Sequence, residues 1–325
     1  TSRGLGDVYK RQAYTVAPVL YGFKHFYPGI RVVGVVFNFV ASVAHYAYLQ
    51  QACADAGVEA LGYIPQDESI VIPSRHLGLS IDETFCFDTF ADRVAEVIDK
   101  TVNVDRLLEL CTVEFSGEQT QDVVCFGNRK IAIARDEAFN FMYRENVEAL
   151  KRAGEVVFFS PLRDKSLPEA DMVYFPGGYP ELHLAELAAN EGMRQSVRKY
   201  CENGGRVLAE CGGMMYLCDT ITDGDGKVYP MAGVLKQGAT MEQMKLKLGY
   251  REVRVNGQRI RGHEFHYSRI LPTNEKIPVI GTIYNAKDMV VDTPVYTYKN
   301  VLASYIHFYW GECGIDHFLM LMSQK

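Results

Sequence analysis

The segment Arg206-Val-Leu-Ala-Glu-Cys-Gly-Gly-Met-Met215 constrains the fold of this chain most strongly, because an apolar strand runs directly into a cysteine and two glycines. A tight strand-to-helix turn exposes the side chain at its tip next to backbone N–H groups. Glycines after the tip let the backbone turn sharply and let a substrate come close. The start of the following helix also favours a thiolate, the reactive form of cysteine. The segment therefore predicts a nucleophile elbow with Cys211 at its tip.

Strand and helix signals alternate along most of the chain, which indicates parallel sheets with helices on their faces. The strands predicted before the elbow cover Arg31–Asn38, Val58–Ile64, Lys130–Ala134, Glu155–Ser160 and Met172–Phe175. The predicted helices include Ser42–Ala56, Glu137–Ala153 and Glu181–Ala189, with a closing helix over Ile315–Met322. After Thr220 strands dominate, and they are predicted over Met231–Leu235, Leu248–Val255, Arg259–Arg269, Val279–Tyr284 and Val301–His307.

The sequence pattern divides the chain into two domains. Residues 1–12 carry three basic residues and two glycines, and no periodicity connects them to the helix signal that begins at Ala13, so we expect a tag or artefact there. The run Glu114–Asp122 is polar and has no apolar period, so a linker is predicted over 113–128. The first domain is then expected over 13–112 and the second over 129–325.

Composition excludes several classes of protein. A hydrophobic content of 48% and a charged content of 23% are typical of globular proteins, and a net charge of -6 argues against a nucleic-acid partner. None of the 8 cysteines forms a Cys-x-x-Cys pair, so neither a zinc site nor a thioredoxin-type site is predicted, and we expect a reducing, cytoplasmic setting. The range Val32–Ala54 lacks charged residues but contains Asn38, Ser42 and His45, so it is better explained by a strand and a capped helix than by a membrane span.

Three further patterns accompany the elbow. Gly177 and Gly178 lie between a strand and a helix signal, where backbone N–H groups could hold an oxyanion, although a turn without a ligand is the alternative. His307 ends an apolar strand and is either a base for the thiol or a core histidine. Glu264 and His266 share one face of a predicted strand, which favours a substrate-facing strand over a metal site.

The sequence contains four motifs whose order resembles that of the class I glutamine amidotransferases. The resemblance is to the branch fused to cobalamin-pathway synthetases, and within it to the cobyrinate a,c-diamide synthases. The motifs are Phe175-Pro-Gly-Gly-Tyr-Pro-Glu-Leu182, Ala209-Glu-Cys-Gly-Gly-Met-Met-Tyr216, Gly262-His-Glu-Phe-His-Tyr-Ser268 and Ala303-Ser-Tyr-Ile-His307. The resemblance covers the chain from residue 13 onward. It implies a partial P-loop, dethiobiotin-synthetase-like parallel-sheet domain followed by a flavodoxin-like α/β amidotransferase domain.

The resemblance also implies roles for the residues of the second domain. Cys211 would attack the side-chain amide of glutamine, and His307 would activate the thiol and protonate the departing ammonia. Backbone N–H groups near Gly178 and Gly212 would hold the oxyanion. The usual triad has a glutamate two residues after the histidine, where this chain has Tyr309. The third group is therefore unassigned, with Glu264 and Glu312 as candidates.

For the first domain, the resemblance implies ATP-dependent synthetase chemistry. Asn38 lies where such folds contact adenine, and Mg²⁺ would accompany ATP. No Gly-x-x-x-x-Gly-Lys-[Ser/Thr] motif occurs in the sequence, and the family carries it at the N-terminus. We therefore expect an N-terminally truncated chain that retains the glutaminase half, with ATP and Mg²⁺ serving the intact parent.

The implied small-molecule substrates are glutamine, ATP and a corrinoid, with amidation of the a and c acetate groups of cobyrinate. Hydrogenobyrinate and nickel-sirohydrochlorin are alternative tetrapyrroles that the sequence does not separate. A cysteine hydrolase of another amide or ester, and a silent fragment with an exposed apolar sheet edge, are further alternatives. No membrane partner is expected, and a homodimer is left open.

Overall fold

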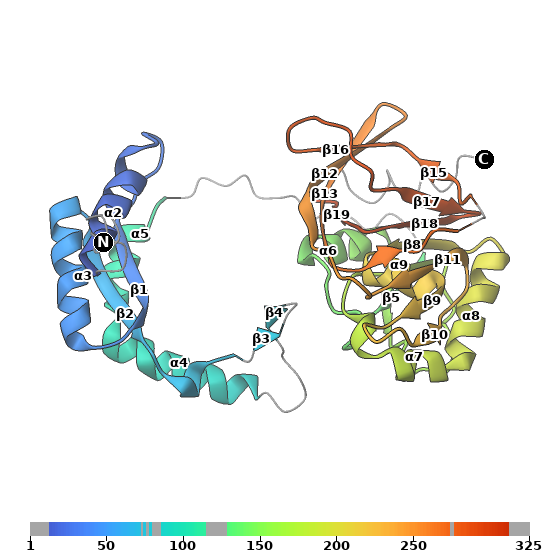
Figure 1. Cartoon of the computed structure of the whole chain (residues 1–325), viewed down its shortest axis with the longest axis horizontal. Coiled ribbons are helices and arrows are strands. Elements are labelled where there is room, and N and C mark those ends of the chain that lie inside the picture. The colour runs from blue at the N-terminus through green and yellow to red at the C-terminus, as the bar shows by residue number, and fades with distance from the viewer. Residues whose placement is uncertain are drawn as a thin grey trace, which may run out of the picture. The chain divides into compact units, whose positions relative to one another are not determined.

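A computed structural model of the chain describes residues 13–72, 74–75, 78–79, 86–114, 129–273 and 276–311. The chain forms two compact units, Thr1–Gln119 and Thr120–Lys325 (Figure 1). The predicted artefact segment, most of the predicted linker, Glu312 and the predicted closing helix lie outside the described residues. The two units are described separately.

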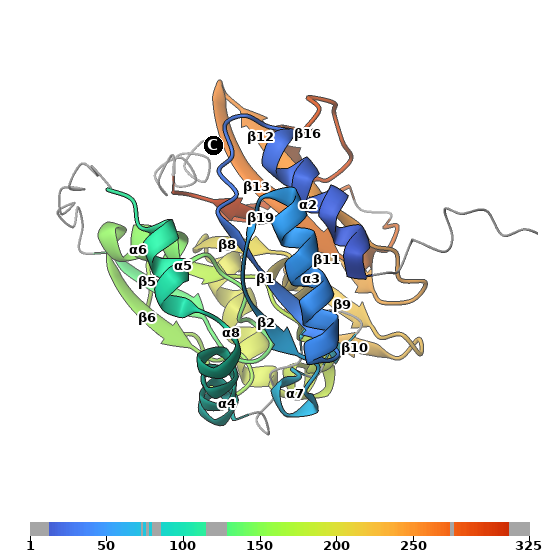
Figure 2. The same cartoon turned by 90° about the vertical axis from the view of Figure 1, so that its left-hand side faces the viewer.

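The first unit begins with a strand–helix–strand arrangement. Strand β1 (Gly34–Val40) pairs in parallel with β2 (Glu59–Pro65), and α3 (Val43–Ala56) connects them. The side chain of Ser42 caps α3 by accepting a hydrogen bond from the N–H of His45 at 3.1 Å. Helix α2 (Val16–His25), preceded by the short turn η1 (Ala13–Thr15), lies alongside α3 (Figure 2). The predicted strand–helix–strand order is confirmed, with boundaries that differ by a few residues.

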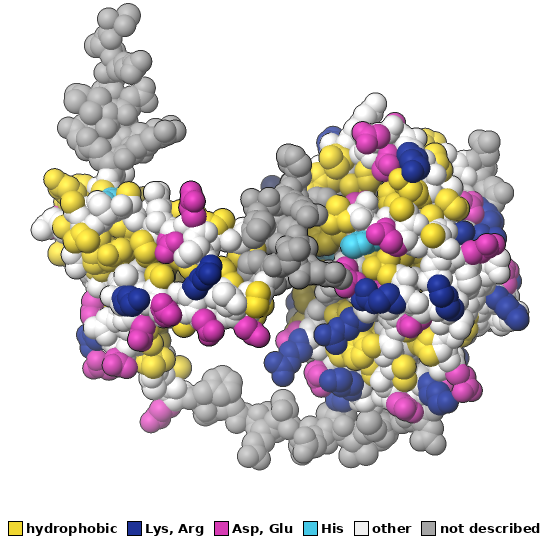
Figure 3. Space-filling view, turned by 90° about the horizontal axis from the view of Figure 1, so that it is seen from below, with side chains coloured by type: hydrophobic (Ala, Val, Ile, Leu, Met, Phe, Trp, Pro, Cys, Tyr) yellow, Lys and Arg dark blue, Asp and Glu magenta, His cyan; other side chains and the backbone are white. Residues whose placement is uncertain are grey.

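Short elements and two further helices complete this unit. They are η2 (Glu68–Ile70), β3 (Ser74–Arg75), β4 (Gly78–Leu79), α4 (Phe87–Thr101) and α5 (Val104–Cys111). Large apolar side chains are exposed on α2 and around β1, and apolar atoms cover much of the face of this unit drawn in Figure 3. They include Val19, Tyr21, Phe23, Phe26, Val36, Phe39, Val43 and Tyr48. Exposed apolar surface of this kind is typical of an interface.

The second unit is built on a seven-stranded sheet with the order β15-β17-β18-β8-β7-β5-β6. The central strands are parallel, and β17 and β15 add antiparallel pairs at one edge. The bounds are β5 (Lys130–Ala134), β6 (Glu155–Phe159), β7 (Met172–Phe175), β8 (Arg206–Glu210), β15 (Val279–Ile280), β17 (Val295–Tyr298) and β18 (Val301–Ser304). The prediction of an α/β fold with parallel sheets is confirmed.

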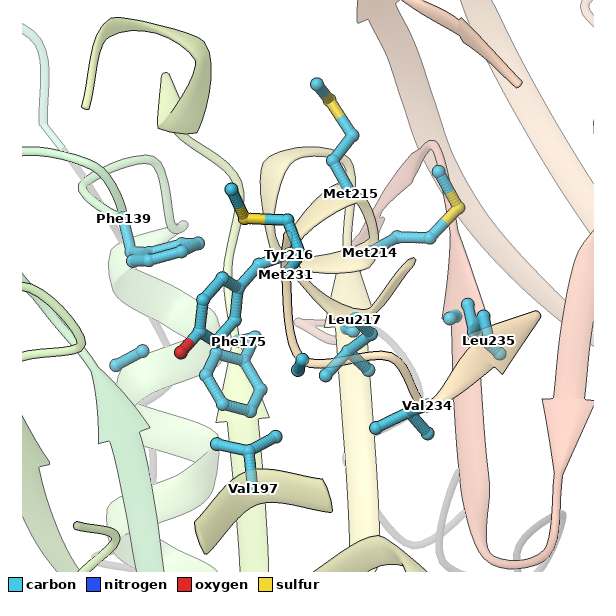
Figure 4. Close-up of a cluster of buried hydrophobic side chains, with 14 of the residues drawn as sticks. Phe139, Phe175, Val197, Met214, Met215, Tyr216, Leu217, Met231, Val234 and Leu235 are labelled. Carbon is cyan, nitrogen blue, oxygen red and sulfur yellow. The ribbon is translucent and has the colours of Figure 1, made fainter. Parts of the chain in front are cut away.

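Alternate residues of the central strands supply two cores, because successive strand side chains point to opposite faces. On β8, Val207 and Ala209 join one core and Leu208 joins the other. The first core packs against η3 (Pro180–Leu182), α7 (Leu184–Ala189), α8 (Glu191–Glu202) and α9 (Gly212–Leu217). Within it the rings of Phe139, Phe175 and Tyr216 meet from three separate segments (Figure 4).

The second core lies between the central sheet and a four-stranded antiparallel sheet, together with α6 (Arg144–Ala153) (Figure 1). This sheet has the order β16-β12-β13-β19. Its strands are β12 (Lys247–Val255), β13 (Gln258–His266), β16 (Thr282–Asn285) and β19 (Ile306–Tyr309). A third sheet contains β9 (Cys218–Thr222), β10 (Val228–Pro230), β11 (Leu235–Thr240) and β14 (Arg269–Ile270).

Several predicted elements of this unit are wrong in part. The strand predicted over Val279–Tyr284 is split at Gly281, so that β15 belongs to the central sheet and β16 to the antiparallel sheet. The helix predicted over Glu137–Ala153 begins only at Arg144, because the Asp136 carboxylate accepts hydrogen bonds from the next N–H groups and holds a turn. The strand predicted over Val301–His307 is interrupted at Tyr305, so β18 and β19 belong to different sheets. In the range Met231–Leu235, only Leu235 is in a strand.

Candidate active site

The elbow lies where β8 meets α9. Cys211 has φ 45° and ψ -108°, a backbone conformation that costs a residue with a side chain roughly 1–3 kcal/mol. The turn is held because the Cys211 N–H donates to the carbonyl of Ser304 at 2.7 Å and its own carbonyl accepts from the N–H of Met215 at 3.0 Å. These two hydrogen bonds therefore fix the backbone of the elbow at Cys211 before any substrate binds.

The glycine turn after β7 touches the elbow. Gly178 has φ 154°, and a methyl group on it would lie 2.2 Å from the carbonyl oxygen of Ala138, so a side chain has no room there. A methyl group on Gly212 would lie 3.2 Å from the nitrogen of Gly178 and 2.7 Å from Cδ of Pro180. Within the described residues the N–H of Gly178 donates no hydrogen bond. The two glycine backbones thus lie in contact.

His307 on β19 lies against the same turn from the other side. A methyl group on Gly177 would be 2.2 Å from Cε1 of His307, which means that the imidazole packs directly on the glycine backbone. The ring stacks on His263 with centroids 4.7 Å apart, and the ring of Phe141 meets it edge-on at 4.6 Å. Its Nδ1 has no hydrogen-bond partner among the described residues. The Gly177–Gly178 turn therefore contacts both the elbow and the imidazole.

Burial determines the favoured protonation states of Cys211 and His307. Desolvation, with a further contribution from the charge of Glu181, raises the pKa of the Cys211 thiol, although the N–H of Gly212 acts in the opposite direction. Desolvation, followed by the neighbouring His263 and His266, lowers the pKa of His307 to about 3. Burial therefore favours the neutral form of the Cys211 thiol and the neutral form of the His307 imidazole. A neutral imidazole can accept a proton, so the thiolate forms as the proton is transferred.

Comparison with known proteins identifies the family. Residues 130–313 match the CobB/CobQ-like glutamine amidotransferase domain. Cobyrinate a,c-diamide synthase of Salmonella typhimurium is 34% identical, with 93% of this chain and 69% of that protein covered. The chain belongs to the CobB/CobQ-like glutamine amidotransferase family. It is therefore a glutamine-dependent amidotransferase.

Other relatives have similar coverage. The enzyme of the same name from Saccharolobus solfataricus is 34% identical over 91% of this chain and 70% of its own length. Hydrogenobyrinate a,c-diamide synthase of Pseudomonas aeruginosa is 36% identical over 91% of this chain and 67% of its own length. A crystal structure of a glutamine amidotransferase covers 60% of this chain and 99% of its own, with 24% identity and a TM-score of 0.41.

Glu210 is a residue of this amidotransferase site that the sequence analysis missed. It precedes Cys211, is 1% exposed, and accepts hydrogen bonds from the hydroxyl of Tyr174 at 2.8 Å and the N–H of Phe308 at 3.2 Å. Burial raises the pKa of this carboxyl to about 8, although both hydrogen bonds act in the opposite direction. A charged residue at the end of an otherwise apolar strand was the available signal.

Glu264 lies at the centre of a buried ion network of the amidotransferase. Its carboxylate accepts hydrogen bonds from Arg251 Nε at 2.7 Å, Thr293 Oγ1 at 2.8 Å and His266 Nε2 at 2.8 Å, and Lys247 Nζ lies 3.3 Å away. Burial opposes ionisation, but these hydrogen bonds and charges outweigh it and lower the pKa of Glu264 to about 2. The side chain is enclosed by these partners, and a role of Glu264 and His266 toward substrate stays a prediction.

His266 is fixed by its own contacts. Its Nε2 faces Glu264, its Nδ1 lies 2.7 Å from the carbonyl of Ser268, and its ring stacks on Tyr305 with centroids 3.6 Å apart. Both of these neighbours are hydrogen-bond acceptors. His266 is also one of the neighbours that lower the pKa of His307.

The remaining predicted site residue is Asn38, which lies near the end of β1 in the first unit. Its side chain is exposed, and its Oδ1 accepts a hydrogen bond from the N–H of Phe39 at 2.9 Å. In the described part of the chain, no group of three His, Cys, Asp or Glu residues could hold a metal ion. No helix there is long and apolar enough to cross a membrane.

Proposed function

We propose that this chain hydrolyses glutamine at Cys211 and that the ammonia amidates the a and c acetate carboxylates of cobyrinate in an ATP-dependent reaction. One observation carries the glutaminase half, namely the Gly177–Gly178 turn that contacts both the elbow and the ring of His307. A thiol, a neutral imidazole and backbone N–H groups are the parts that acyl transfer requires.

The glutaminase step follows from these parts. The proton of the Cys211 thiol passes to His307 as sulfur bonds to the amide carbon of glutamine. The N–H groups of Gly178 and Gly212 stabilise the oxyanion. His307 then gives its proton to the departing nitrogen, which leaves as ammonia, and a thioester remains. Water, deprotonated by His307, attacks the thioester and releases glutamate and the thiol.

The synthetase half is assigned to residues 13–112 and the glutaminase half to residues 129–325. The exposed amide of Asn38 fits a contact with adenine, since a carboxamide offers both a donor and an acceptor. When bound with Mg²⁺, ATP supplies activation of the substrate carboxylate. Ammonia has to reach that carboxylate unprotonated, which favours a route shielded from water.

Hydrogenobyrinate is the second candidate for the amidated substrate. A relative named for that substrate is 36% identical to this chain, and a relative named for cobyrinate is 34% identical. Incubation of the protein with each of the two tetrapyrroles, glutamine and ATP, followed by mass spectrometry for the amide products, distinguishes these candidates.

The glutaminase proposal is tested by labelling with a diazoketone analogue of glutamine and peptide mass spectrometry. The expected result is a single label on Cys211 that excess glutamine suppresses, with release of glutamate from glutamine in a parallel assay. Buried Cys201 serves as an internal control that remains unlabelled. A folded sample that neither labels nor releases glutamate contradicts the proposal.

A further inference from the structure

His307 carries a buried ring nitrogen without a hydrogen-bond partner. Within the described residues its Nδ1 bonds to no group, and the whole side chain is only 4% exposed. In a catalytic triad, a carboxylate bonded to this nitrogen orients the ring and stabilises the imidazolium that forms during the reaction. The contacts that the structure describes for the ring of His307 are aromatic instead.

His263 packs flat on the ring of His307. The two residues face each other across β13 and β19, where the register pairs 263 with 307. Their ring centroids are 4.7 Å apart and their planes differ by 15°. Phe141 meets both rings edge-on, with centroid distances of 4.6 Å to His307 and 5.6 Å to His263. The plane of the His307 ring is therefore set by the packing of neighbouring rings, with the backbone of Gly177 against its Cε1–Nδ1 edge.

Tyr143 in turn holds His263. Its hydroxyl lies 2.6 Å from Nδ1 of His263, and its own ring packs edge-on against Tyr309. When a phenol hydroxyl donates to this nitrogen, the proton of the imidazole is on Nε2 and the ring is neutral. Burial acts in the same direction, because desolvation lowers the pKa of His263. The contact with Tyr143 and the burial thus both favour a neutral His263.

The face of a neutral aromatic ring attracts a cation. We propose, building on the glutaminase function of Cys211, that His263 is a positioning residue that takes the place of a triad carboxylate. Its ring holds His307 in the plane needed for proton transfer and lies against the imidazolium that forms, and Tyr143 keeps it neutral and in place. The thiol proton moves to His307 and later to the departing nitrogen, while His263 neither gains nor loses a proton.

The first test replaces His263 by alanine and by phenylalanine and measures glutamine hydrolysis. His263→Ala uncovers one face of the base, so kcat should fall ~10- to 100-fold while the KM for glutamine stays within about 3-fold. His263→Phe keeps a neutral ring in the stack and should exceed the kcat of His263→Ala by at least ~5-fold. Rates are divided by the concentration of active sites titrated to completion with the diazoketone analogue, so a loss of folded protein does not lower them.

The second test asks whether Tyr143 acts through His263. Tyr143→Phe removes the hydroxyl and keeps the ring, and it should lower kcat by ~3- to 10-fold, as is typical of one lost hydrogen bond. In a His263→Phe background the same substitution should have no further effect, because the bond is already absent. This cycle remains decisive even if the alanine variant folds poorly.

Tyr250→Phe is the matched control for the loss of a phenol hydroxyl. Tyr250 pairs with His263 across β12 and β13, but its side chain is 75% exposed. This substitution should leave kcat unchanged, since Tyr250 has no part in the proposed contact.

A pH profile gives a readout that loss of stability alone would not change. Desolvation, followed by His263 and His266, lowers the pKa of His307 to about 3, so this base stays neutral in the wild type between about pH 5 and 7. His263→Ala admits water and removes one of these histidines, so the pKa of His307 should rise toward 6.5. The variant should then lose kcat/KM as the pH falls below about 6.5. His266 is present in every variant and does not separate them.

The outcomes separate this inference from the proposed function. A wild type that hydrolyses glutamine while His263→Ala keeps the full kcat per active site overturns the role of His263 alone. Equally low kcat values for His263→Ala and His263→Phe also overturn it, and so does an effect of Tyr143→Phe that persists in the His263→Phe background. A wild type that neither hydrolyses glutamine nor reacts with the diazoketone overturns the glutaminase function itself.

Discussion

Oε1 of the Glu210 carboxyl group accepts a hydrogen bond at 3.2 Å from the backbone N–H of Phe308. The residue before Cys211 is thereby hydrogen-bonded to the residue after His307. This bond joins β8 of the central sheet to β19 of the antiparallel sheet. The relative position of Cys211 and His307 therefore depends on a buried carboxyl group that belongs to neither residue. A hydrogen bond from Tyr174 holds the same carboxyl group in place.

Replacement of Glu210 by glutamine should weaken the pH dependence of stability. The folded-state pKa of about 8 lies above the ordinary value of 4.5, so between these values the folded protein holds a proton that the unfolded chain lacks. Stability should fall as the pH rises through this window, by up to about 1.4 kcal/mol per pH unit from this group. Urea unfolding at pH 6 and pH 8 measures how much the free energy of unfolding changes between these pH values, and this change should be smaller in Glu210→Gln. An unchanged value in the variant would show that Glu210 is not the group with the raised pKa.

Replacement of Cys211 by serine should abolish glutamate release and diazoketone labelling while the fold remains intact. The substitution is nearly isosteric, and the backbone bonds of the elbow do not involve the side chain, so the free energy of unfolding should change by less than about 1 kcal/mol. Cys201→Ala in α8 is the matched control, which should lose some stability and keep activity. If Cys211→Ser released glutamate at the wild-type rate, another residue would be the nucleophile.

The sequence was sufficient to predict the elbow and the glycine turn, because both depend on local patterns. An apolar strand, a nucleophile and two glycines define Arg206–Gly213, and the structure has strand β8, the turn and α9 at those positions. The strand predicted over Met172–Phe175 also has the observed bounds. These segments are continuous in the chain, so propensity and spacing carry the necessary information.

The sequence did not predict the contacts that bring distant segments together. Nothing in the run Val301–His307 indicates that it leaves one sheet at Tyr305 and enters another, since both halves are apolar and buried. The bond from Phe308 to Glu210 and the packing of His307 on Gly177 arise from that change of sheet. Such contacts follow from tertiary packing, which a single sequence without aligned relatives does not specify.

Gly177→Ala should displace the imidazole of His307. The added methyl group would lie 2.2 Å from Cε1, and the stacked His263 restricts movement of the ring. We expect a loss of stability of about 1–3 kcal/mol from overpacking and a fall in kcat of at least ~10-fold from misplacement of the base. Gly224→Ala has open space around its new methyl group and should be neutral in both assays. Full glutaminase activity in Gly177→Ala would show that His307 is not the base.

Glu264→Gln should destabilise the second unit and make its stability depend less on pH in the acid range. The substitution leaves Arg251, Lys247 and His266 around a neutral group, and breaking a buried ion pair costs about 3–5 kcal/mol. The pKa of Glu264 is lowered from 4.5 to about 2, so its contribution is complete above pH 4.5 and is lost as the pH falls toward 2. Urea unfolding at pH 7 and pH 3.5 should therefore give a smaller difference in the free energy of unfolding for the variant than for the wild type.

Glu252→Gln is the control, because the ion pairs of Glu252 are more exposed. This substitution should lower the free energy of unfolding by less than about 1 kcal/mol at pH 7. Equal losses for the two variants would contradict the central position of Glu264 in the network.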